Sequence, residues 1–373
     1  MTFVLVFSGF ALLYAGLIAW FTYGWIRLPV FWHKENNDVS FSVIIPVRNE
    51  ASNIMRLLIL LRNQEYPKGQ YEVIVVDDHS SDTTASIIER KIASGFLTNV
   101  RLLRADQFKR EAGKKNALSL GIEKAANPWI VTVDADCIMG RHWLQSLAGF
   151  IEQEQPDMVI GQVSVIPSKS LFSQMQALEF MSLTGSTAGA ASIGKPIMCN
   201  GANLAFRKDY FEKVGGYAGN ENYASGDDVF LLHKFKKLKG ARISFLKSHG
   251  GLVYTRASVN LKEFLQQRGR WAGKAGGYRD GFTLVTGFVV AGYSLIIAAG
   301  IIWGLFFSVS LLTTALMALV FKALIDFPIM FSVSGFLRKR ELMWLYPALS
   351  LVYPFYVSAS LFYGFFLKPS WKA

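Results

Sequence analysis

Charged side chains are scarce in this chain, and the scarcity is confined to three stretches. Asp, Glu, Lys and Arg make up 18% of the 373 residues, against about 25% in an ordinary soluble domain. Residues 1–26, 281–321 and 342–367 contain none of the four. In residues 27–280 the fraction of charged residues is that of an ordinary soluble domain. The composition therefore excludes a purely soluble protein and a disordered chain, and indicates a soluble domain flanked by apolar segments.

Cysteine and the common phosphate-binding signatures are also scarce or absent. The chain has two cysteines, Cys137 and Cys199, which excludes a disulfide scaffold. No GxGxxG follows the first apolar run of the soluble section, and no GxxxxGK followed by Ser or Thr occurs. A dinucleotide-binding fingerprint and a P-loop NTPase are therefore excluded.

The uncharged stretches are long enough to cross a bilayer, which needs about 20 apolar residues. We expect four membrane spans, near 1–28, 282–307, 311–335 and 342–367. The first lacks the basic start and the cleavage site of a signal peptide, so we interpret it as a retained anchor. Lys322 and Asp326 are four residues apart and should pair on one helix face. A functional role for these two intramembrane charges is the alternative.

Positive charge sets the expected orientation. Arg338, Lys339 and Arg340 lie in the short loop between the last two spans, and the positive-inside rule places that loop in the cytoplasm. Section 27–280 then faces the cytoplasm too, as in a protein of the bacterial cytoplasmic membrane. Lys368 and Lys372 would fall on the opposite side, which leaves the orientation of the last span open.

The net charge of +12 is explained more simply by anionic lipid headgroups and a phosphorylated substrate than by nucleic acid. We therefore expect the lipid bilayer as a partner, no nucleic acid, and no obligatory protein partner.

Apolar, β-branched runs alternate with helical patterns in the first half of the soluble section. The expected strands are 41–46, 71–76, 100–103 and 129–133, and the expected helices are 52–62, 83–93 and 114–126. This alternation predicts an α/β domain with a mostly parallel, Rossmann-like sheet. Such sheets bind ligands at the carboxyl ends of their strands, where two of these strands run into acidic clusters.

Asp134 and Asp136 follow the expected strand 129–133. Alternate side chains of an extended segment point the same way, so the two carboxylates can converge. Hard oxygen ligands of this kind suit Mg²⁺ or Mn²⁺, which would neutralise a departing diphosphate. A pair of solvated loop carboxylates, or a helix cap, is the alternative.

Asp77 and Asp78 follow the expected strand 71–76 in the same way. They could cap the next helix, although Ser80, Ser81 or Asp82 could do so instead. In that case Asp77 and Asp78 are available to accept hydrogen bonds from a base or a ribose.

Asp227 and Asp228 precede a helical pattern, and either Ser225 or Asp227 could cap that helix. The functional interpretation is that this pair supplies a general base.

Gln267, Arg270 and Trp271 belong to the segment QRGRW, about ten residues before the second span. Leu261, Phe264 and Leu265 recur at helical spacing before it, so we expect an interfacial amphipathic helix within 257–280. Its arginines would contact lipid phosphates and its tryptophan would lie at the interface. The functional interpretation adds an arginine on a diphosphate and an indole on a sugar.

Taken together, these residues resemble the membrane-anchored branch of the family-2 glycosyltransferases, which includes the ceramide glucosyltransferases and the cellulose, chitin and hyaluronan synthases. The resemblance covers about 42–271 and the flanking spans. It rests on SVIIPVRNE (42–50), VIVVDDHSSDTT (73–84), GKKNALSLGI (113–122), VTVDADC (131–137), MCNGANLAFRK (198–208), SGDD (225–228) and QRGRW (267–271). In SGDD, Gly226-Asp227 stands where the family has Thr-Glu. Asp227 keeps the carboxylate, but its side chain is one methylene shorter than that of Glu.

The resemblance implies a glycosyltransferase A-type fold and single displacement with inversion, assisted by Mg²⁺ or Mn²⁺. Asp228 would be the catalytic base, and Asp134 and Asp136 would hold the metal. Donor contacts would come from Pro46, Arg48, Glu50, Asp77, Asp78, Lys114 and Asp134. Contacts to the acceptor or the diphosphate would come from Asp227, Gln267, Arg270 and Trp271. The implied domains are an anchor (1–28), a cytoplasmic glycosyltransferase domain (40–256), the interfacial helix (257–280) and three C-terminal spans (281–373).

The donor would be a nucleotide sugar, with a uridine diphosphate sugar as our expectation. The acceptor would be a hydroxyl of a membrane lipid, because four spans leave little room for a polymer channel. The alternative is a growing glycan, made by a small processive synthase of a β-linked polysaccharide. Segment 168–196 could be an amphipathic helix that admits the lipid, or ordinary core packing. A transporter or receptor with a non-catalytic nucleotide-binding domain is the alternative of a different class.

Overall fold

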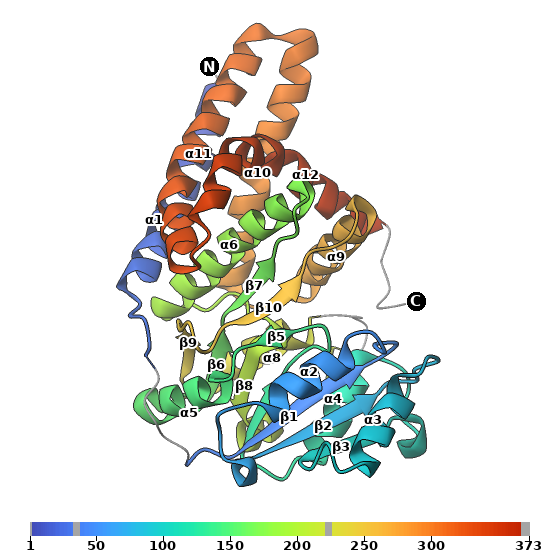
Figure 1. The fold of residues 1–373 in the computed structure, drawn as a ribbon. Coiled ribbons are helices and arrows are strands. Elements are labelled where there is room, and N and C mark those ends of the chain that lie inside the picture. The colour runs from blue at the N-terminus through green and yellow to red at the C-terminus, as the bar shows by residue number, and fades with distance from the viewer. Residues whose placement is uncertain (1, 33–37, 221–225, 367–373) are drawn as a thin grey trace. The chain divides into compact units, whose positions relative to one another are not determined.

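The structure is a computed structural model that describes residues 2–32, 38–220 and 226–366, and it divides into two compact units (Figure 1). The helical unit comprises the chain up to Leu28, Val165–Ile197 and the described chain from Ala257 onwards. The sheet unit comprises Pro29–Ser164 and Met198–Arg256. The domain expected over 40–256 differs from this division in one segment, because Val165–Ile197 packs with the apolar helices.

The sheet unit contains the strands and helices expected from the alternating pattern. Its strands are β1 (Phe41–Val47), β2 (Tyr71–Asp77), β3 (Val100–Arg104), β4 (Trp129–Thr132), β5 (Ile138–Met139), β6 (Met158–Gly161), β7 (Val163–Ile166, which ends in the helical unit), β8 (Leu204–Arg207), β9 (Ile243–Leu246) and β10 (Val253–Arg256). Its α-helices are α2 (Ile54–Arg62), α3 (Thr84–Ala93), α4 (Lys114–Glu123), α5 (Trp143–Glu154), α7 (Lys208–Lys213) and α8 (Asp227–Lys237). Short 3₁₀ turns are η1 (Lys68–Gln70), η2 (Asp106–Phe108) and η3 (Gly201–Asn203).

Seven strands form the main sheet, in the order β3-β2-β1-β4-β8-β6-β9. The pairs β3–β2, β2–β1, β1–β4 and β6–β9 are parallel, and β8 runs antiparallel to β4 and β6. The prediction of a mostly parallel sheet is therefore confirmed. Since β1 pairs with β2 on one side and β4 on the other, the strand order reverses at β1, which is where such sheets bind ligands. A second sheet has the order β5-β10-β7.

Strand β1 lies at the centre of the core, and all seven of its residues are buried. Helix α4 packs closely over it, because a Cβ added to Gly121 would lie 2.6 Å from the Ile44 side chain. In the register of the sheet Val47 is opposite Asp77, and Ile44 is opposite Thr132. The residues that follow β1, β2 and β4 are therefore brought to one edge of the sheet.

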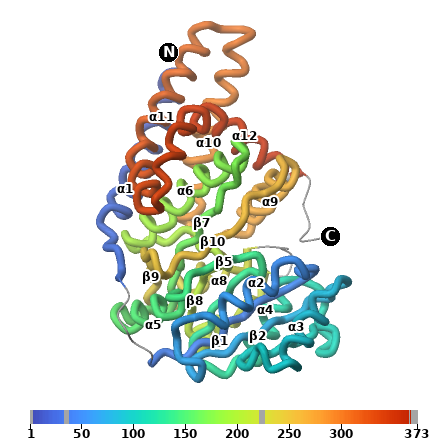
Figure 2. The backbone as a smooth tube through the Cα atoms, viewed as in Figure 1, coloured from blue at the N-terminus to red at the C-terminus, as the bar shows by residue number. Residues whose placement is uncertain are grey.

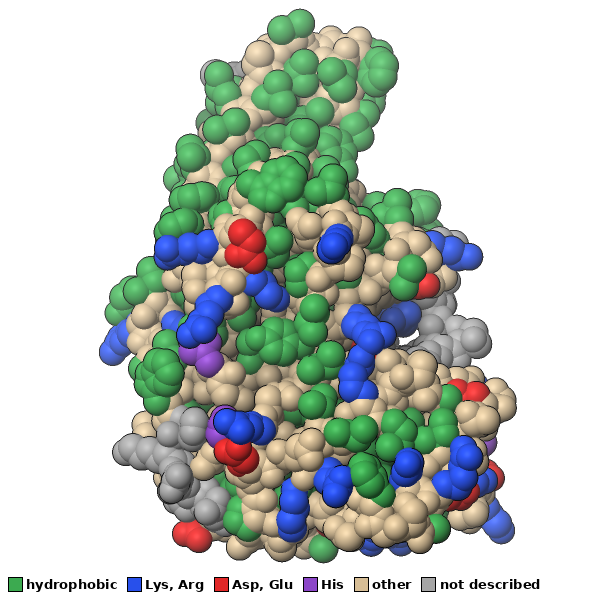
Figure 3. Space-filling model, viewed as in Figure 1, with side chains coloured by type: hydrophobic (Ala, Val, Ile, Leu, Met, Phe, Trp, Pro, Cys, Tyr) green, Lys and Arg blue, Asp and Glu red, His purple; other side chains and the backbone are tan. Residues whose placement is uncertain are grey.

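The helical unit contains four helices long and apolar enough to cross a membrane. They cover Phe3–Arg27, Gly281–Phe307, Val309–Phe336 and Arg340–Gly364, with mean hydropathy of 2.1, 2.1, 1.9 and 1.3. The unit's elements are α1 (Thr2–Arg27), α6 (Leu171–Ser192), α9 (Leu261–Gly273), η4 (Lys274–Gly277), α10 (Gly281–Phe307), α11 (Val309–Phe336), η5 (Arg340–Leu345) and α12 (Tyr346–Phe366). Hydrophobic side chains cover the visible face of the α10–α11 hairpin (Figure 3). The four expected spans therefore correspond to long apolar helices.

Helix α6 lies among the apolar helices of the helical unit (Figure 2), and small residues let their backbones approach closely. A Cβ at Gly189 would lie 2.1 Å from the Phe21 carbonyl oxygen of α1, and a Cβ at Gly24 would lie 2.3 Å from the Gly189 carbonyl oxygen. Gly185 faces Ile329 of α11 in the same way. This is the close backbone approach that small residues permit between apolar helices. Of the two interpretations of 168–196, the structure favours helix packing.

The intramembrane charges pair as expected. Nζ of Lys322 lies 2.6 Å from Oδ2 of Asp326 on α11. The Tyr14 hydroxyl of α1 donates to Oδ1 of Asp326 at 2.7 Å, and the Tyr353 ring of α12 lies 4.1 Å from the Lys322 ammonium. The pair therefore links three helices, which is the arrangement that makes charge tolerable in an apolar unit.

The contact between α1 and α6 predicts a matched pair of substitutions. Gly24→Ala should lower the thermal unfolding temperature by several degrees, because overpacking costs about 1–3 kcal/mol. Gly16→Ala, on the same helix, should not, since a Cβ there meets nothing within 4 Å. Both are measured on detergent-solubilised protein by fluorescence-detected thermal unfolding. Equal unfolding temperatures for the two variants would contradict the contact.

Candidate active site

Charged side chains gather at the carboxyl ends of β1, β2 and β4. Arg48 directly follows β1, Asp77 is the last residue of β2, and Asp134 comes two residues after β4. Lys114 joins them from the start of α4, because its ammonium lies 2.5 Å from Oδ1 of Asp134. The negative charge of Asp228, at the start of α8, also acts on Lys114. The sequence-predicted residues of the sheet unit therefore form one cluster at the switch point.

Asp134 and Asp136 lie on a turn and not on an extended strand. Strand β4 ends at Thr132, and the Cys137 amide donates to the Asp134 carbonyl at 3.1 Å. This corrects the expectation that strand alternation aligns the two carboxylates; the turn brings them together. The charge of Asp134 acts on Asp136, whose pKa is raised by burial and by that charge. Thr255 of β10 opposes the rise by donating to Oδ2 of Asp136 at 3.0 Å.

The Asp134–Asp136 pair can supply some of the ligands of a divalent metal ion, but not a full coordination shell. Hard carboxylate oxygens suit Mg²⁺ or Mn²⁺. Within the described residues, no three His, Cys, Asp or Glu side chains come together as metal ligands. Oδ2 of Asp134 accepts no hydrogen bond from the described residues. These residues fit a divalent cation whose coordination is completed by substrate phosphates and water.

Lys114 provides a fixed positive charge beside Asp134. Burial opposes the charged form of its ammonium, but the carboxylates of Asp134, Asp228 and Asp227 outweigh burial and raise the pKa of Lys114. The lysine therefore stays protonated at neutral pH and can interact with an anion at this edge of the sheet.

Asp77 and Asp78 have different roles. Asp78 is fully buried, and both of its oxygens accept from the Gly113 amide, at 2.9 and 3.0 Å. Gly113 begins α4 with φ of 149°, a conformation that L residues rarely adopt. Asp78 thus fixes the loop that precedes Lys114, and its contact with a ligand stays a prediction.

Asp77 has an oxygen that no described residue uses. Its Oδ1 is buried and has no hydrogen-bond partner among the described residues. Burial raises the pKa of Asp77, and hydrogen bonds from Ser80 oppose the rise. The N-cap of α3 is Thr83, which makes no side-chain capping bond; Asp82, one residue earlier, accepts from the Thr84 amide through Oδ1 at 2.9 Å.

Pro46, Arg48 and Glu50 surround the end of β1. Pro46 is buried within β1, and Nη1 of Arg48 lies 3.9 Å from Oδ2 of Asp78. Glu50 is buried; its amide donates to Thr84 Oγ1 at 2.8 Å, and its charge contributes to the raised pKa of Asp136. Glu50 therefore lies near the Asp134–Asp136 turn.

Asp227 and Asp228 interact with different partners. Oδ1 of Asp227 lies 3.5 Å from the Lys115 ammonium. Asp228 accepts from the Gly201 amide at 3.0 Å and from the Val229 amide at 2.8 Å. Gly226, with φ of 96°, is the N-cap of α8; the alternative cap Ser225 lies outside the described residues. The Asp228 carboxylate is thus held by two backbone donors at a helix start.

Gln267, Arg270 and Trp271 lie on α9, in the helical unit. Arg268 lies between them in the sequence and is buried, with its Nη2 at 2.5 Å from Oε2 of Glu179. This corrects the expectation that the arginines of this segment all contact lipid phosphate. Desolvation lowers the pKa of Arg270.

Several residues of the site carry no local sequence signal. Arg56 of α2 donates to the Asp136 carbonyl at 2.9 Å, and Thr255 reaches the same aspartate from a strand 119 positions later. Gly201 reaches Asp228 through its backbone amide, which no side-chain pattern reveals. Lys115, next to Lys114 in the sequence, is the residue that a search for charge partners could have found.

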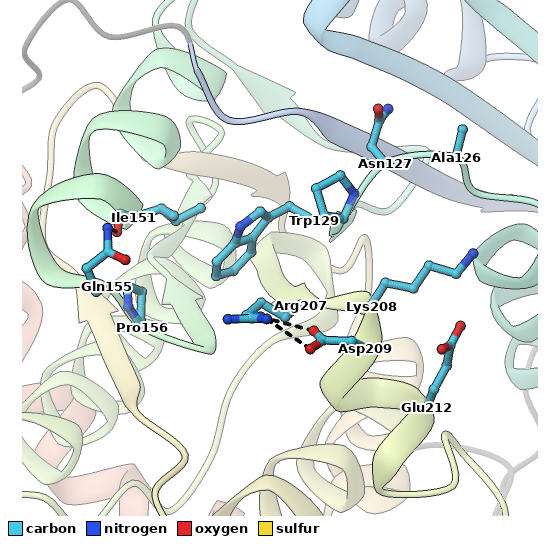
Figure 4. A pocket seen from close by; sticks show the side chains of 11 residues that line it. Ala126, Asn127, Trp129, Ile151, Gln155, Pro156, Arg207, Lys208, Asp209 and Glu212 are labelled. Carbon is cyan, nitrogen blue, oxygen red and sulfur yellow. Dashed lines mark hydrogen bonds and ion pairs between the residues drawn. The ribbon is translucent and has the colours of Figure 1, made fainter.

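A cavity of about 490 Å³ lies elsewhere in the sheet unit (Figure 4). It is lined by Trp129 at the start of β4 and by Arg207, whose guanidinium forms two hydrogen bonds with Asp209. The cluster described above is at the opposite end of β4, so this cavity is not part of it.

Acidic side chains at the switch point of a mostly parallel sheet define an α/β enzyme of the Rossmann-like class. Comparison with known families agrees. The model described as "Glycosyl transferase family 2" matches residues 42–215, and that described as "Glycosyl transferase family group 2" matches 129–364. The chain belongs to the family-2 glycosyltransferases.

Two curated relatives and one solved structure are also similar to this chain. Glycosyltransferase AglE of Haloferax volcanii is 32% identical over 216 residues, which are 56% of this chain and 64% of AglE. Beta-monoglucosyldiacylglycerol synthase of Trichormus variabilis is 29% identical over 142 residues, 38% of this chain and 30% of that protein. The matches thus span less than two thirds of these relatives. The mannosyltransferase PcManGT of Pyrobaculum calidifontis, solved with GDP-Man and Mn2+, has a TM-score of 0.63 at 19% identity, over 98% of this chain and 99% of that one. The likeness confirms the glycosyltransferase A-type fold.

Proposed function

We propose that this glycosyltransferase transfers a sugar from a nucleotide-diphosphate sugar, of the uridine type, to a hydroxyl of a membrane lipid, with inversion at the anomeric carbon. The observation that carries the proposal is the acidic cluster at the switch point, together with the four helices of the described residues that are long enough to cross a membrane. Its orphaned buried oxygen, Oδ1 of Asp77, calls for a ligand donor such as a base or ribose.

The donor would lie across the ends of β1, β2 and β4. Asp77 would accept from the nucleoside, beside Pro46, Arg48 and Glu50. Asp78 would act indirectly, by fixing the loop before Lys114. Asp134 and Asp136 would hold Mg²⁺ or Mn²⁺, which supplies neutralisation of the leaving diphosphate when bound.

Asp228 is positioned to act as the base. Hydrogen bonds from the Gly201 and Val229 amides fix the orientation of its carboxylate. Asp228 removes the proton of the acceptor hydroxyl, and that oxygen bonds to the anomeric carbon from the face opposite the diphosphate. The bond from the anomeric carbon to the diphosphate oxygen breaks, and the pair of electrons leaves with the diphosphate. Lys114 stabilises the negative charge that develops, and Asp227 holds Lys115 beside it.

The acceptor assignment rests on the helical unit. Its long apolar helices would keep the enzyme at a bilayer, and a relative named beta-monoglucosyldiacylglycerol synthase supports a lipid acceptor. Gln267, Arg270 and Trp271 are proposed to contact the acceptor or the diphosphate. Arg338 and Lys339, between the third and fourth apolar helices, and Arg340, the first residue of the fourth, support a cytoplasmic site by the positive-inside rule.

Replacing the base tests the chemistry. Asp228→Asn should lower the transfer rate by about 10²- to 10⁴-fold, because general-base catalysis is worth that much. Donor affinity, measured by calorimetry, should change by less than about twofold, a difference under about 0.4 kcal/mol. The exposed Asp209→Asn serves as the matched control. Near wild-type turnover in Asp228→Asn would remove Asp228 as the base.

Replacing the second aspartate of the turn tests the metal. Wild-type donor affinity should rise when Mn²⁺ is added, and Asp136→Ala should lose that rise because one of two hard ligands is gone. Glu123→Ala, at an exposed glutamate, is the control. An unchanged Mn²⁺ effect in Asp136→Ala would exclude this residue as a ligand.

The product distinguishes a lipid from a glycan acceptor. Membranes containing the enzyme are incubated with Mn²⁺ and a panel of radiolabelled uridine-diphosphate sugars, with GDP-mannose as a further arm. We expect label in the chloroform–methanol extract, and only background from Asp228→Asn membranes. Label retained as high-molecular-weight material would overturn the lipid acceptor in favour of a processive synthase.

A further inference from the structure

Arg268 is a buried arginine in the middle of the segment QRGRW. Its exposed fraction is 6%. Nη2 lies 2.5 Å from Oε2 of Glu179 on α6, and Glu179 is itself 2% exposed. The other oxygen of Glu179 accepts from the Tyr356 hydroxyl of α12 at 2.7 Å. One carboxylate therefore joins α6, α9 and α12.

The same guanidinium contacts two residues of its own segment. Nη1 donates to Oε1 of Gln267 at 2.8 Å. The guanidinium carbon lies 4.2 Å from the centre of the Trp271 ring, within cation–π range. A planar fork can donate to an amide and a carboxylate while its face stacks on an indole, which an ammonium cannot do.

Backbone contact limits how α9 can move relative to α12. A Cβ on Gly364 would lie 2.5 Å from the Gly269 carbonyl oxygen and 2.8 Å from the Gly273 amide. The Phe180 ring of α6 meets Trp271 edge-on, with ring centres 6.4 Å apart. With α9 held at this distance, Arg268 contacts Glu179, Gln267 and Trp271 and so lies where it can set the orientation of the last two side chains.

The energetics argue that the pair does more than hold the helices. A buried ion pair is often matched or exceeded in stability by apolar residues of similar volume, because desolvation offsets the attraction. Glycine contacts and aromatic packing already join α9 to its neighbours.

We propose that Arg268 is a positioning residue that holds the Gln267 amide and the Trp271 indole in the orientation required for sugar transfer, with Glu179 and Tyr356 as its anchor. The proposal rests on the proposed function, in which Gln267 and Trp271 contact the acceptor or the diphosphate.

The test replaces the whole cluster by apolar side chains. Glu179→Leu, Arg268→Met and Tyr356→Phe are combined, so that no buried charge is left without its partner; the half-buried Gln267 loses the hydrogen bond from Arg268. We expect the thermal unfolding temperature to match or exceed the wild type. The transfer kcat should fall about 10- to 100-fold, as expected for misplaced groups. Donor affinity should change by less than about twofold.

A matched control removes a second ion pair of the helical unit, between Lys322 and Asp326. Lys322→Met, Asp326→Leu and Tyr14→Phe are combined, since that pair has a similar length, 2.6 Å, but lies on α11. This variant should keep the wild-type kcat. Wild-type kcat in the Glu179/Arg268/Tyr356 variant would overturn the proposal, because the cluster would then be only a structural link.

A spectroscopic measurement separates this proposal from the proposed function. The protein is labelled with 5-fluorotryptophan, and the ¹⁹F resonance of Trp271 is assigned by its loss in Trp271→Phe. Arg268→Lys, which keeps the charge near Glu179 but cannot stack as a plane, should shift that resonance. An unshifted resonance overturns the positioning role even if the wild type transfers no sugar. A shifted resonance in an enzyme without transfer supports the positioning role and overturns only the proposed function.

Discussion

The pairing of β1 with β2 on one side and β4 on the other is the constraint on which the site depends. This register places the ends of three strands at one edge, so that Asp77, Arg48 and Asp134 become neighbours although 86 positions separate Arg48 from Asp134. Strand β1 is buried along its whole length, and a shift by one residue would turn its side chains to the opposite face. The core therefore determines the register, and the register assembles the charges.

The partner of each acidic side chain, a lysine or a backbone amide, then determines whether that side chain can bind a ligand. Lys114 forms an ion pair with Asp134, and Lys115 forms one with Asp227. Backbone amides donate hydrogen bonds to Asp78 and Asp228. A buried carboxylate is tolerated only with such partners. Asp77 retains an oxygen that no described residue contacts by a hydrogen bond, so it is the member of the cluster with the clearest capacity for a ligand.

The helices of the helical unit need other contacts to hold them together, because burying apolar side chains between them gains little when the alternative is contact with lipid. Glycine contacts between α1 and α6, and between α9 and α12, allow backbones to approach closely. The Lys322–Asp326 and Glu179–Arg268 pairs add directional links. QRGRW thus lies on a helix whose neighbours are fixed by contacts at specific positions, and this is why a residue between the motif positions can govern their orientation.

The sequence by itself determined the elements whose signals are local. Uncharged stretches long enough for a bilayer marked α1, α10, α11 and α12, and alternating apolar runs marked β1 to β4 with their helices, within one or two residues at most ends. It also determined which residues stand after each strand. Only the tertiary structure decided that the antiparallel β8 enters the sheet, that Val165–Ile197 joins the helical unit, that Asp78 is occupied by Gly113, and that Arg268 is buried on Glu179. These facts depend on partners distant in the chain or on backbone groups, which side-chain spacing does not record.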